Sequence, residues 1–235
     1  MRPGFINSFR PANFGQFVPT QYKWTLDQTS GPWSDAWNGS VLTATGSVTP
    51  NVVGKIDRAV TFAGGYLDST ILTTGPFSWN LWARRNANAT ADQFQYLMDN
   101  LNEAAPPSSG GGGTILLIDD DSSYRPFLTG AHSNLFANPG TSMTLGVWRM
   151  VTVTWSGTTL RLWVDNVLQT DSAATTQLVS SYPIRLGSSS RSGRFFAPSN
   201  VSIDDVRIYP YVLSPAQIAA IFSGGNAGAS VDPVP

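Results

Sequence analysis

Hydrophobic and polar residues alternate in short stretches along most of this chain. The clearest case lies near its end, where Val206 and Ile208 alternate with polar neighbours within SIDDVRIY, residues 202–209. A period of two lets one face be buried while the other stays polar, so this stretch predicts a strand. Pro210 ends the strand, because proline removes a backbone donor and suits a strand end rather than its middle.

The residues after Pro210 carry the pattern of a short helix. Ser214 can accept from the first-turn amides, Pro215 sits where its missing N–H costs nothing, and Gln217 completes an S-x-x-Q capping box. The Gly224-Gly225 pair predicts the end of this helix. Its apolar stripe consists of Ile218 together with Ile221 or Phe222.

Similar alternation predicts further strands, and turn residues separate them. The dipeptide Asp165-Asn166 predicts a type I′ hairpin turn, because both residue types tolerate positive φ. About a dozen short strands and one brief helix predict an all-β fold, a two-sheet antiparallel jelly-roll sandwich with one short C-terminal helix. The further strands are expected within residues 41–48, 60–62, 77–82, 94–98, 114–118, 151–155, 160–164 and 183–186.

The pattern divides the chain into a core domain with an extension at each end. Residues 21–224 form the predicted jelly-roll domain, and the small, polar, proline-ended residues 225–235 predict a flexible tail. Residues 1–20 have neither helical nor strand period and predict an extended arm. Exposure of its aromatic side chains to water is unfavourable in free energy, so the arm is expected to pack on its own domain or on a neighbouring subunit. These residues are Phe5, Phe9, Phe14 and Phe17.

Composition narrows the classes of function. Charged residues make up 12% of the 235 residues, about half the usual share, and the formal net charge is -1, which argues against a nucleic-acid partner. The chain has no cysteine, which excludes disulfides, thiolate chemistry and a cysteine-based zinc site. No apolar run is long enough for a signal peptide or a membrane span. If Met1 is the natural start, we expect the protein to be made in the cytosol.

Three further segments, together with residues 202–222, carry motifs in a recognisable order. They are GKIDRAVTFAGGYLDS (54–69), FSWNLWARR (77–85) and WRMVTVTWSGTTLRLWVDNVLQT (148–170). The chain resembles, over roughly residues 20–222, a laminin-G-like domain of the concanavalin A-like lectin/glucanase superfamily. Arg58, Trp163 and Asn166 depart from the usual glycine, tyrosine and glycine of that pattern, but none of them removes a core position.

The same scaffold is used by lichenase-type hydrolases, which carry two glutamates around an aspartate in one strand. This chain has one glutamate, Glu103, so that motif cannot be built. The consecutive residues Asp119–Asp121 would point to alternate faces of a strand. His132 is the one histidine and lies in a turn-like segment, which favours a solvated loop residue over a catalytic base. We therefore expect no enzymatic activity and no catalytic residues.

Calcium is the one cofactor that the resemblance implies. Many relatives hold Ca²⁺ with a carboxylate from the DDVRIY strand and backbone carbonyls from a glycine turn. The matching positions are Asp204, or less favourably Asp205, and Gly64 with Gly65. The alternative is that Asp204 pairs with an arginine or caps a turn.

A candidate ligand surface follows from the strands at 77–85 and 159–164. Trp82 and Arg84 lie on the face opposite the apolar residues of the first strand, and Arg161 and Trp163 do so on the second. If both strands belong to one sheet, these residues form a patch that could stack on a sugar or anchor a protein. The alternative is that the tryptophans are buried.

These features predict a non-catalytic recognition or structural module. The favoured hypothesis is a phage-type virion surface protein, a capsid decoration or tail-associated component, attached through the arm to a capsid or tail protein or to its own oligomer. It could bind glycan or protein, without nucleic acid and without membrane insertion. The alternative is a carbohydrate-binding or adhesion module of a secreted or cell-surface protein.

Overall fold

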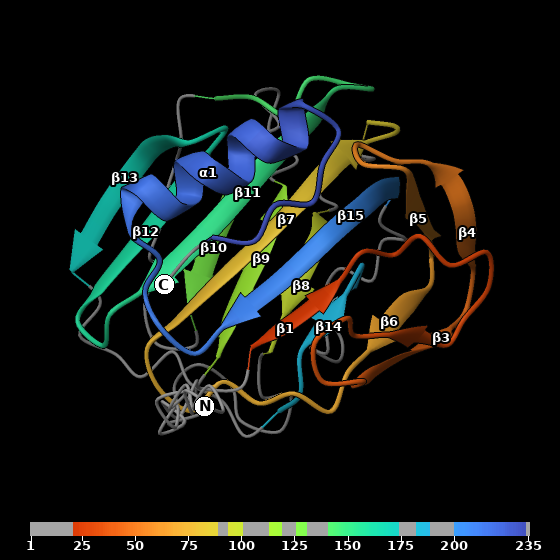
Figure 1. The fold of residues 1–235 in the computed structure, drawn as a ribbon, viewed down its shortest axis with the longest axis horizontal. Coiled ribbons are helices and arrows are strands. Elements are labelled where there is room, and N and C mark those ends of the chain that lie inside the picture. The colour runs from red at the N-terminus through yellow and green to blue at the C-terminus, as the bar shows by residue number, and fades with distance from the viewer. Residues whose placement is uncertain are drawn as a thin grey trace, which may run out of the picture.

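The computed structural model describes residues 21–88, 94–100, 113–118, 126–130, 141–173, 182–188 and 200–233. These residues form two facing antiparallel sheets and one helix, α1 (Pro215–Asn226) (Figure 1). The predicted all-β jelly-roll sandwich with one short C-terminal helix is confirmed. No helix of the described part of the chain is long and apolar enough to span a membrane.

The first sheet has eight strands and carries α1 on its outer face. Its order is β13-β12-β11-β7-β15-β5-β4, and β1 pairs with the second half of β15. The central strand β15 (Asn200–Tyr209) contains the alternating stretch at 202–209. The other strands are β1 (Tyr22–Trp24), β4 (Val48–Val53), β5 (Arg58–Ala63), β7 (Phe77–Arg85), β11 (Trp148–Trp155), β12 (Thr159–Val164) and β13 (Val167–Ala173).

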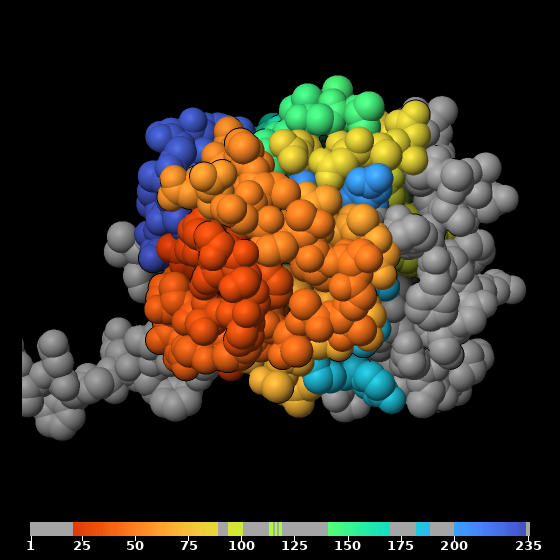
Figure 2. Space-filling view, turned by 90° about the vertical axis from the view of Figure 1, so that its right-hand side faces the viewer, coloured from red at the N-terminus to blue at the C-terminus, as the bar shows by residue number. Residues whose placement is uncertain are grey.

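The second sheet has seven strands in the order β10-β9-β8-β14-β6-β3-β2. It lies behind the first sheet in Figure 1. Figure 2 views the sandwich from the edge side, where the red-to-orange segments that contain β1 to β5 cover much of the surface. The strands are β2 (Trp33–Ser34), β3 (Val41–Thr45), β6 (Tyr66–Asp68), β8 (Gln95–Asp99), β9 (Thr114–Ile118), β10 (Pro126–Gly130) and β14 (Arg185–Leu186).

The main hydrophobic core fills the space between the two sheets. Val206 and Ile208 of β15 point into it, as their alternation predicts. Phe77, Trp79 and Leu81 of β7 do the same, and all three are buried. The outer face of the first sheet is therefore formed by the intervening residues of each strand.

Helix α1 begins as the sequence predicts and ends later. Ser214 and Gln217 form the expected capping box, and Ile218 and Ile221 are buried against the sheet. The predicted end at Gly224-Gly225 is wrong, because the helix continues to Asn226. A Cβ on Gly225 would lie 2.5 Å from the Trp82 ring, and one on Gly224 would lie 2.4 Å from Val231. The two glycines therefore allow close packing rather than ending the helix.

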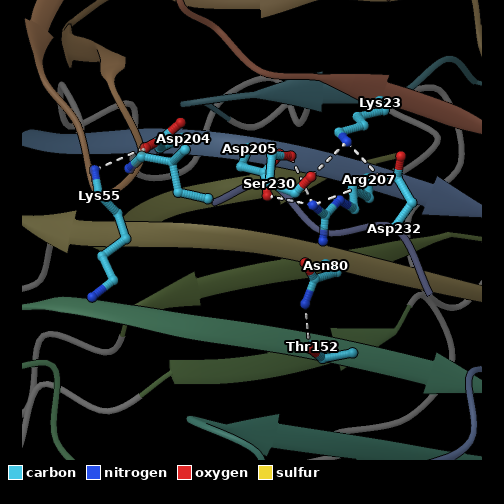
Figure 3. Close-up of polar contacts among 10 residues, drawn as sticks. Lys23, Lys55, Asn80, Thr152, Asp204, Asp205, Arg207, Ser230 and Asp232 are labelled. Carbon is cyan, nitrogen blue, oxygen red and sulfur yellow. Dashed lines mark hydrogen bonds and ion pairs between the residues drawn. The ribbon is translucent and has the colours of Figure 1, made fainter. Parts of the chain in front are cut away.

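The segment after α1 folds back onto the first sheet. Ser230 donates through its hydroxyl to Asp205 at 2.6 Å and accepts from Arg207 at 2.9 Å. Lys23 of β1 forms an ion pair with Asp232 (Figure 3). Ser230 and Asp232, within the predicted flexible tail, thus have polar contacts with the first sheet.

Candidate functional site

The four residues of the predicted ligand patch lie on one sheet but not together. Strand β11 lies between β7, which carries Trp82 and Arg84, and β12, which carries Arg161 and Trp163. The residues that separate them, such as Met150 opposite Trp82 and Thr152 opposite Trp163, point to the same outer face. The continuous patch that the sequence suggested is therefore not formed.

Trp82 lies beneath helix α1. Its side chain is 1% exposed, and its ring stacks on Phe222 of the helix with centroids 5.8 Å apart and planes at 17°. Met150 and Ile221 belong to the same buried cluster. The expectation that Trp82 contacts a ligand at the surface is thus corrected, because the helix covers this position.

Trp163 and Arg161 lie nearer the β13 edge of the sheet. Trp163 is half-buried against the cluster beneath α1 and pairs across strands with Thr152 and Leu168. Arg161 lies opposite Thr154 on β11. Neither residue pairs with β7, so they do not join Arg84 in one site.

Arg84 forms a different cluster with residues that the sequence did not single out. Its guanidinium lies over the Trp148 ring, 4.9 Å from the centroid. It donates from Nε to Asn86 Oδ1 at 3.1 Å and from Nη2 to Ser202 Oγ at 3.3 Å. The Ser202 hydroxyl is 2.7 Å from the Thr61 hydroxyl. The Trp148 ring, the Arg84 guanidinium and the hydroxyls of Ser202 and Thr61 thus lie together on the outer face of the first sheet.

Strand register explains this arrangement. Arg84 on β7 lies opposite Trp148 on β11 and opposite Ser202 on β15, and Ser202 lies opposite Thr61 on β5. We call these four residues the Trp148–Thr61 row. The Ser202 side chain is buried, whereas the other three side chains are half-buried. In Figure 2, yellow, green and light-blue segments, the colours of the stretches that contain Arg84, Trp148 and Ser202, lie close together in the upper part of the view.

A second arginine stack lies on the other sheet. The Arg185 guanidinium lies 4.0 Å from the centroid of the Tyr66 ring, and its Nε and Nη2 donate to the Asp68 carboxylate at 2.7 and 3.2 Å. In contrast to Arg84, this cation has a carboxylate partner. Local sequence patterns do not indicate this cluster, because Asp68 of β6 and Arg185 of β14 are separated by 117 residues.

The predicted calcium residues do not converge. Oδ2 of Asp204 accepts the backbone N–H groups of Lys55 and Ile56, both at 2.8 Å (Figure 3). Burial raises the pKa of Asp204 to about 8, which outweighs the lowering by these two N–H donors. A protonated carboxyl that faces N–H donors is a poor ligand for a hard cation.

Asp205 is also occupied by other partners. It adopts φ 46° at an irregularity in the β15–β7 pairing, and its Oδ2 lies 2.8 Å from Arg207 Nη2. Burial raises the pKa of Asp205, while Arg207 and Ser230 oppose this shift. Gly64 follows Ala63, which pairs with Asn200 on β15. Asn200 precedes Asp204 by four residues, which corresponds to about 13 Å along a strand.

These residues do not fit a shared calcium ion. Among the residues that the structure describes, no three acidic, histidine or cysteine side chains are placed so that they could hold a metal ion together. Several predicted residues lie outside that part. They are Phe5, Phe9, Phe14 and Phe17 of the arm, and Glu103, Asp119–Asp121 and His132.

The two stacked antiparallel sheets define a jelly-roll β-sandwich of the lectin-like class. Residues 55–219 match the family model described as "Concanavalin A-like lectin/glucanases superfamily". The chain belongs to this superfamily, as its motifs suggested. No curated protein matches the chain.

Solved structures with the same fold share little sequence with this chain. A sialidase from Trypanosoma rangeli matches at a TM-score of 0.68 and 16% identity, over 89% of this chain and 33% of its own. This chain thus spans a third of the sialidase's length. Domain 4 of an extracellular arabinanase from Geobacillus stearothermophilus, in complex with arabinotriose, matches at a TM-score of 0.65 and 13% identity. The match covers 84% of this chain and 95% of that domain. The binding domain of Paraclostridial Mosquitocidal Protein 1 matches at a TM-score of 0.61 and 14% identity, over 86% of this chain and 51% of its own.

Proposed function

We propose that this chain is a non-catalytic carbohydrate-recognition module that binds its ligand at the Trp148–Thr61 row. The observation that carries the proposal is the Arg84 guanidinium stacked on the half-buried Trp148 ring, beside the side chains of Asn86 and Thr61. An aromatic ring stacks on the apolar face of a sugar, while amide, hydroxyl and guanidinium groups bond its hydroxyls.

The superfamily and its structural neighbours support a carbohydrate ligand. The arabinanase domain was solved with arabinotriose, and this chain covers nearly all of that domain. The comparison supports the same class of ligand here.

The carboxyl groups of β15 support a binding role over a catalytic one. Retaining glycosidases need two carboxyl groups about 5–5.5 Å apart on either side of the scissile bond. Asp204 accepts two backbone N–H groups and Asp205 pairs with Arg207, and both carboxyls are buried. Neither is free to act on a substrate.

A glycan array, followed by titration calorimetry with the best ligand, tests this proposal. Arg84→Ala and Trp148→Ala should each weaken binding at least tenfold while the fold still melts cooperatively. Arg149→Ala is the matched control, because Arg149 is adjacent in sequence and pairs with Asp165 instead. Undiminished binding by both row variants would refute the site.

A location on a virion surface also stays a proposal. It draws on the aromatic arm, residues 1–20, and on the expectation of synthesis in the cytosol. Deletion of residues 1–20 should abolish incorporation into a particle or an oligomer and leave the melting of the domain cooperative. Unchanged incorporation would reject this attachment role and leave carbohydrate recognition untouched.

A further inference from the structure

Arg84 keeps a positive charge that no carboxylate neutralises within the described part of the chain. Its contacts are the Trp148 ring, the Asn86 side-chain oxygen and the Ser202 hydroxyl, which are all neutral. An arginine side chain remains protonated throughout the range in which proteins fold. The Trp148–Thr61 row therefore carries an uncompensated cation that is only half-buried.

Lys55 adds a second positive charge on the same face of the first sheet. Its ammonium lies over the Trp82 ring, 4.8 Å from the centroid, and Trp82 is two residues before Arg84 on the same face of β7. Its backbone N–H binds Asp204, but Figure 3 shows its side chain running away from that carboxyl and across β7. Two cations thus lie above two tryptophan rings on adjacent strands.

The Asp204 carboxyl, on the strand next to β7, does not offset these charges. Asp204 lies opposite Trp82, fully buried. Because burial raises the pKa of Asp204 to about 8, this side chain is mostly neutral at pH 7. Asp27 accepts the backbone N–H of Arg58 and so belongs to the adjoining loop rather than to the row.

Arg185 provides an internal comparison. It also lies over an aromatic ring, that of Tyr66, but the Asp68 carboxylate binds it through two nitrogens. A charge that is already paired has little to gain from an anionic ligand, because the ligand must first displace the carboxylate. The two arginine stacks therefore differ in the ligand charge that they favour.

We infer that the carbohydrate bound at the Trp148–Thr61 row carries an anionic group, a carboxylate or a sulfate, that pairs with Arg84 and Lys55. This inference rests on the proposed function and specifies the class of its ligand. The guanidinium fork matches two oxygens of such a group, and the Trp148 ring supports the adjoining sugar. Lys55 supplies a second, less directional attraction.

An array that presents neutral saccharides beside their carboxylated and sulfated counterparts tests the inference. The full chain should bind an acidic member at least tenfold more tightly than its neutral parent, and 0.5 M NaCl should remove most of that preference. Arg84→Gln should reduce the acidic-to-neutral ratio to about one, as the 1.4 kcal/mol of a tenfold preference is lost. Lys55→Gln should reduce it partly. Arg185→Gln is the matched control and should leave the ratio unchanged.

The alternatives separate clearly. Equal or tighter binding of the neutral parents, without salt dependence, overturns the anionic ligand and leaves carbohydrate recognition intact. Binding of none of the saccharides overturns the proposed function and this inference with it. Loss of the preference in Arg185→Gln but not in Arg84→Gln would move the anion site to the second sheet and refute it here.

Discussion

The Phe222 ring of helix α1 stacks on the Trp82 ring of β7 at a centroid distance of 5.8 Å. This contact joins the helix to the outer face of the first sheet. We predict that Trp82→Ala lowers the free energy of unfolding by about 3–5 kcal/mol, because a large buried side chain is replaced by a cavity. Urea denaturation measures this loss. Trp148→Ala, which truncates a half-buried ring, should lower the free energy of unfolding clearly less. An equal loss would contradict the deeper burial of Trp82.

Asp204 should make stability fall as pH rises. Its pKa is about 8 in the fold and 3.8 in the reference state, so the folded chain holds a proton that the unfolded chain releases. The contribution of the Asp204 proton to the free energy of unfolding is complete below about pH 4. It is lost between about pH 4 and pH 8, at up to about 1.4 kcal/mol per pH unit. Above pH 8 the loss levels off.

Asp204→Asn isolates this effect, because the amide oxygen can still accept the N–H groups of Lys55 and Ile56. Unfolding free energies of both proteins should be measured from pH 4.5 to pH 9. The wild type should lose stability relative to the variant as pH rises to 8. Parallel curves would show that Asp204 is ionised in the fold.

Ser230 should contribute to stability although it follows the helix. Its hydroxyl contacts both members of the buried Asp205–Arg207 pair. Ser230→Ala leaves these groups with fewer partners and should cost about 1–3 kcal/mol. Ser223→Ala, at an exposed helix position, should change stability little. Equal melting temperatures for the two variants would mean that residues 227–233 do not hold this contact in solution.

Calcium should leave the melting temperature unchanged. Asp204 and Asp205 are bound by N–H donors and by Arg207, and Gly64 lies too far along the strand to share an ion with them. Differential scanning calorimetry in EDTA and in 5 mM Ca²⁺ tests this expectation. A rise of several degrees with calcium would contradict it.

Local rules predicted much of the fold. The capping box of Ser214 and Gln217 depends on residues three apart, and it forms as predicted. Asp165 and Asn166 both adopt the positive φ of the expected hairpin turn, at 49° and 65°. Alternation also assigned Val206 and Ile208 to the core. Each prediction needed only neighbouring residues.

The candidate site depended on contacts that local patterns do not contain. Alternation placed Trp82 on the face away from the core, but it could not show that α1 covers that position. It also places Trp148 opposite the buried face of Val151 and Val153, and this could have identified Trp148 from the sequence. The contact of Arg84 with Ser202 joins residues 118 apart, and only the register of β7 and β15 brings them together.

The position of β15 has a consequence for biosynthesis. This strand lies between β7 and β5 in the first sheet, yet it is the last strand of the chain. While the ribosome is still adding residues before 200, the two halves of that sheet have no strand to join them. We therefore expect the domain to complete its folding only after residues 200–209 have left the exit tunnel.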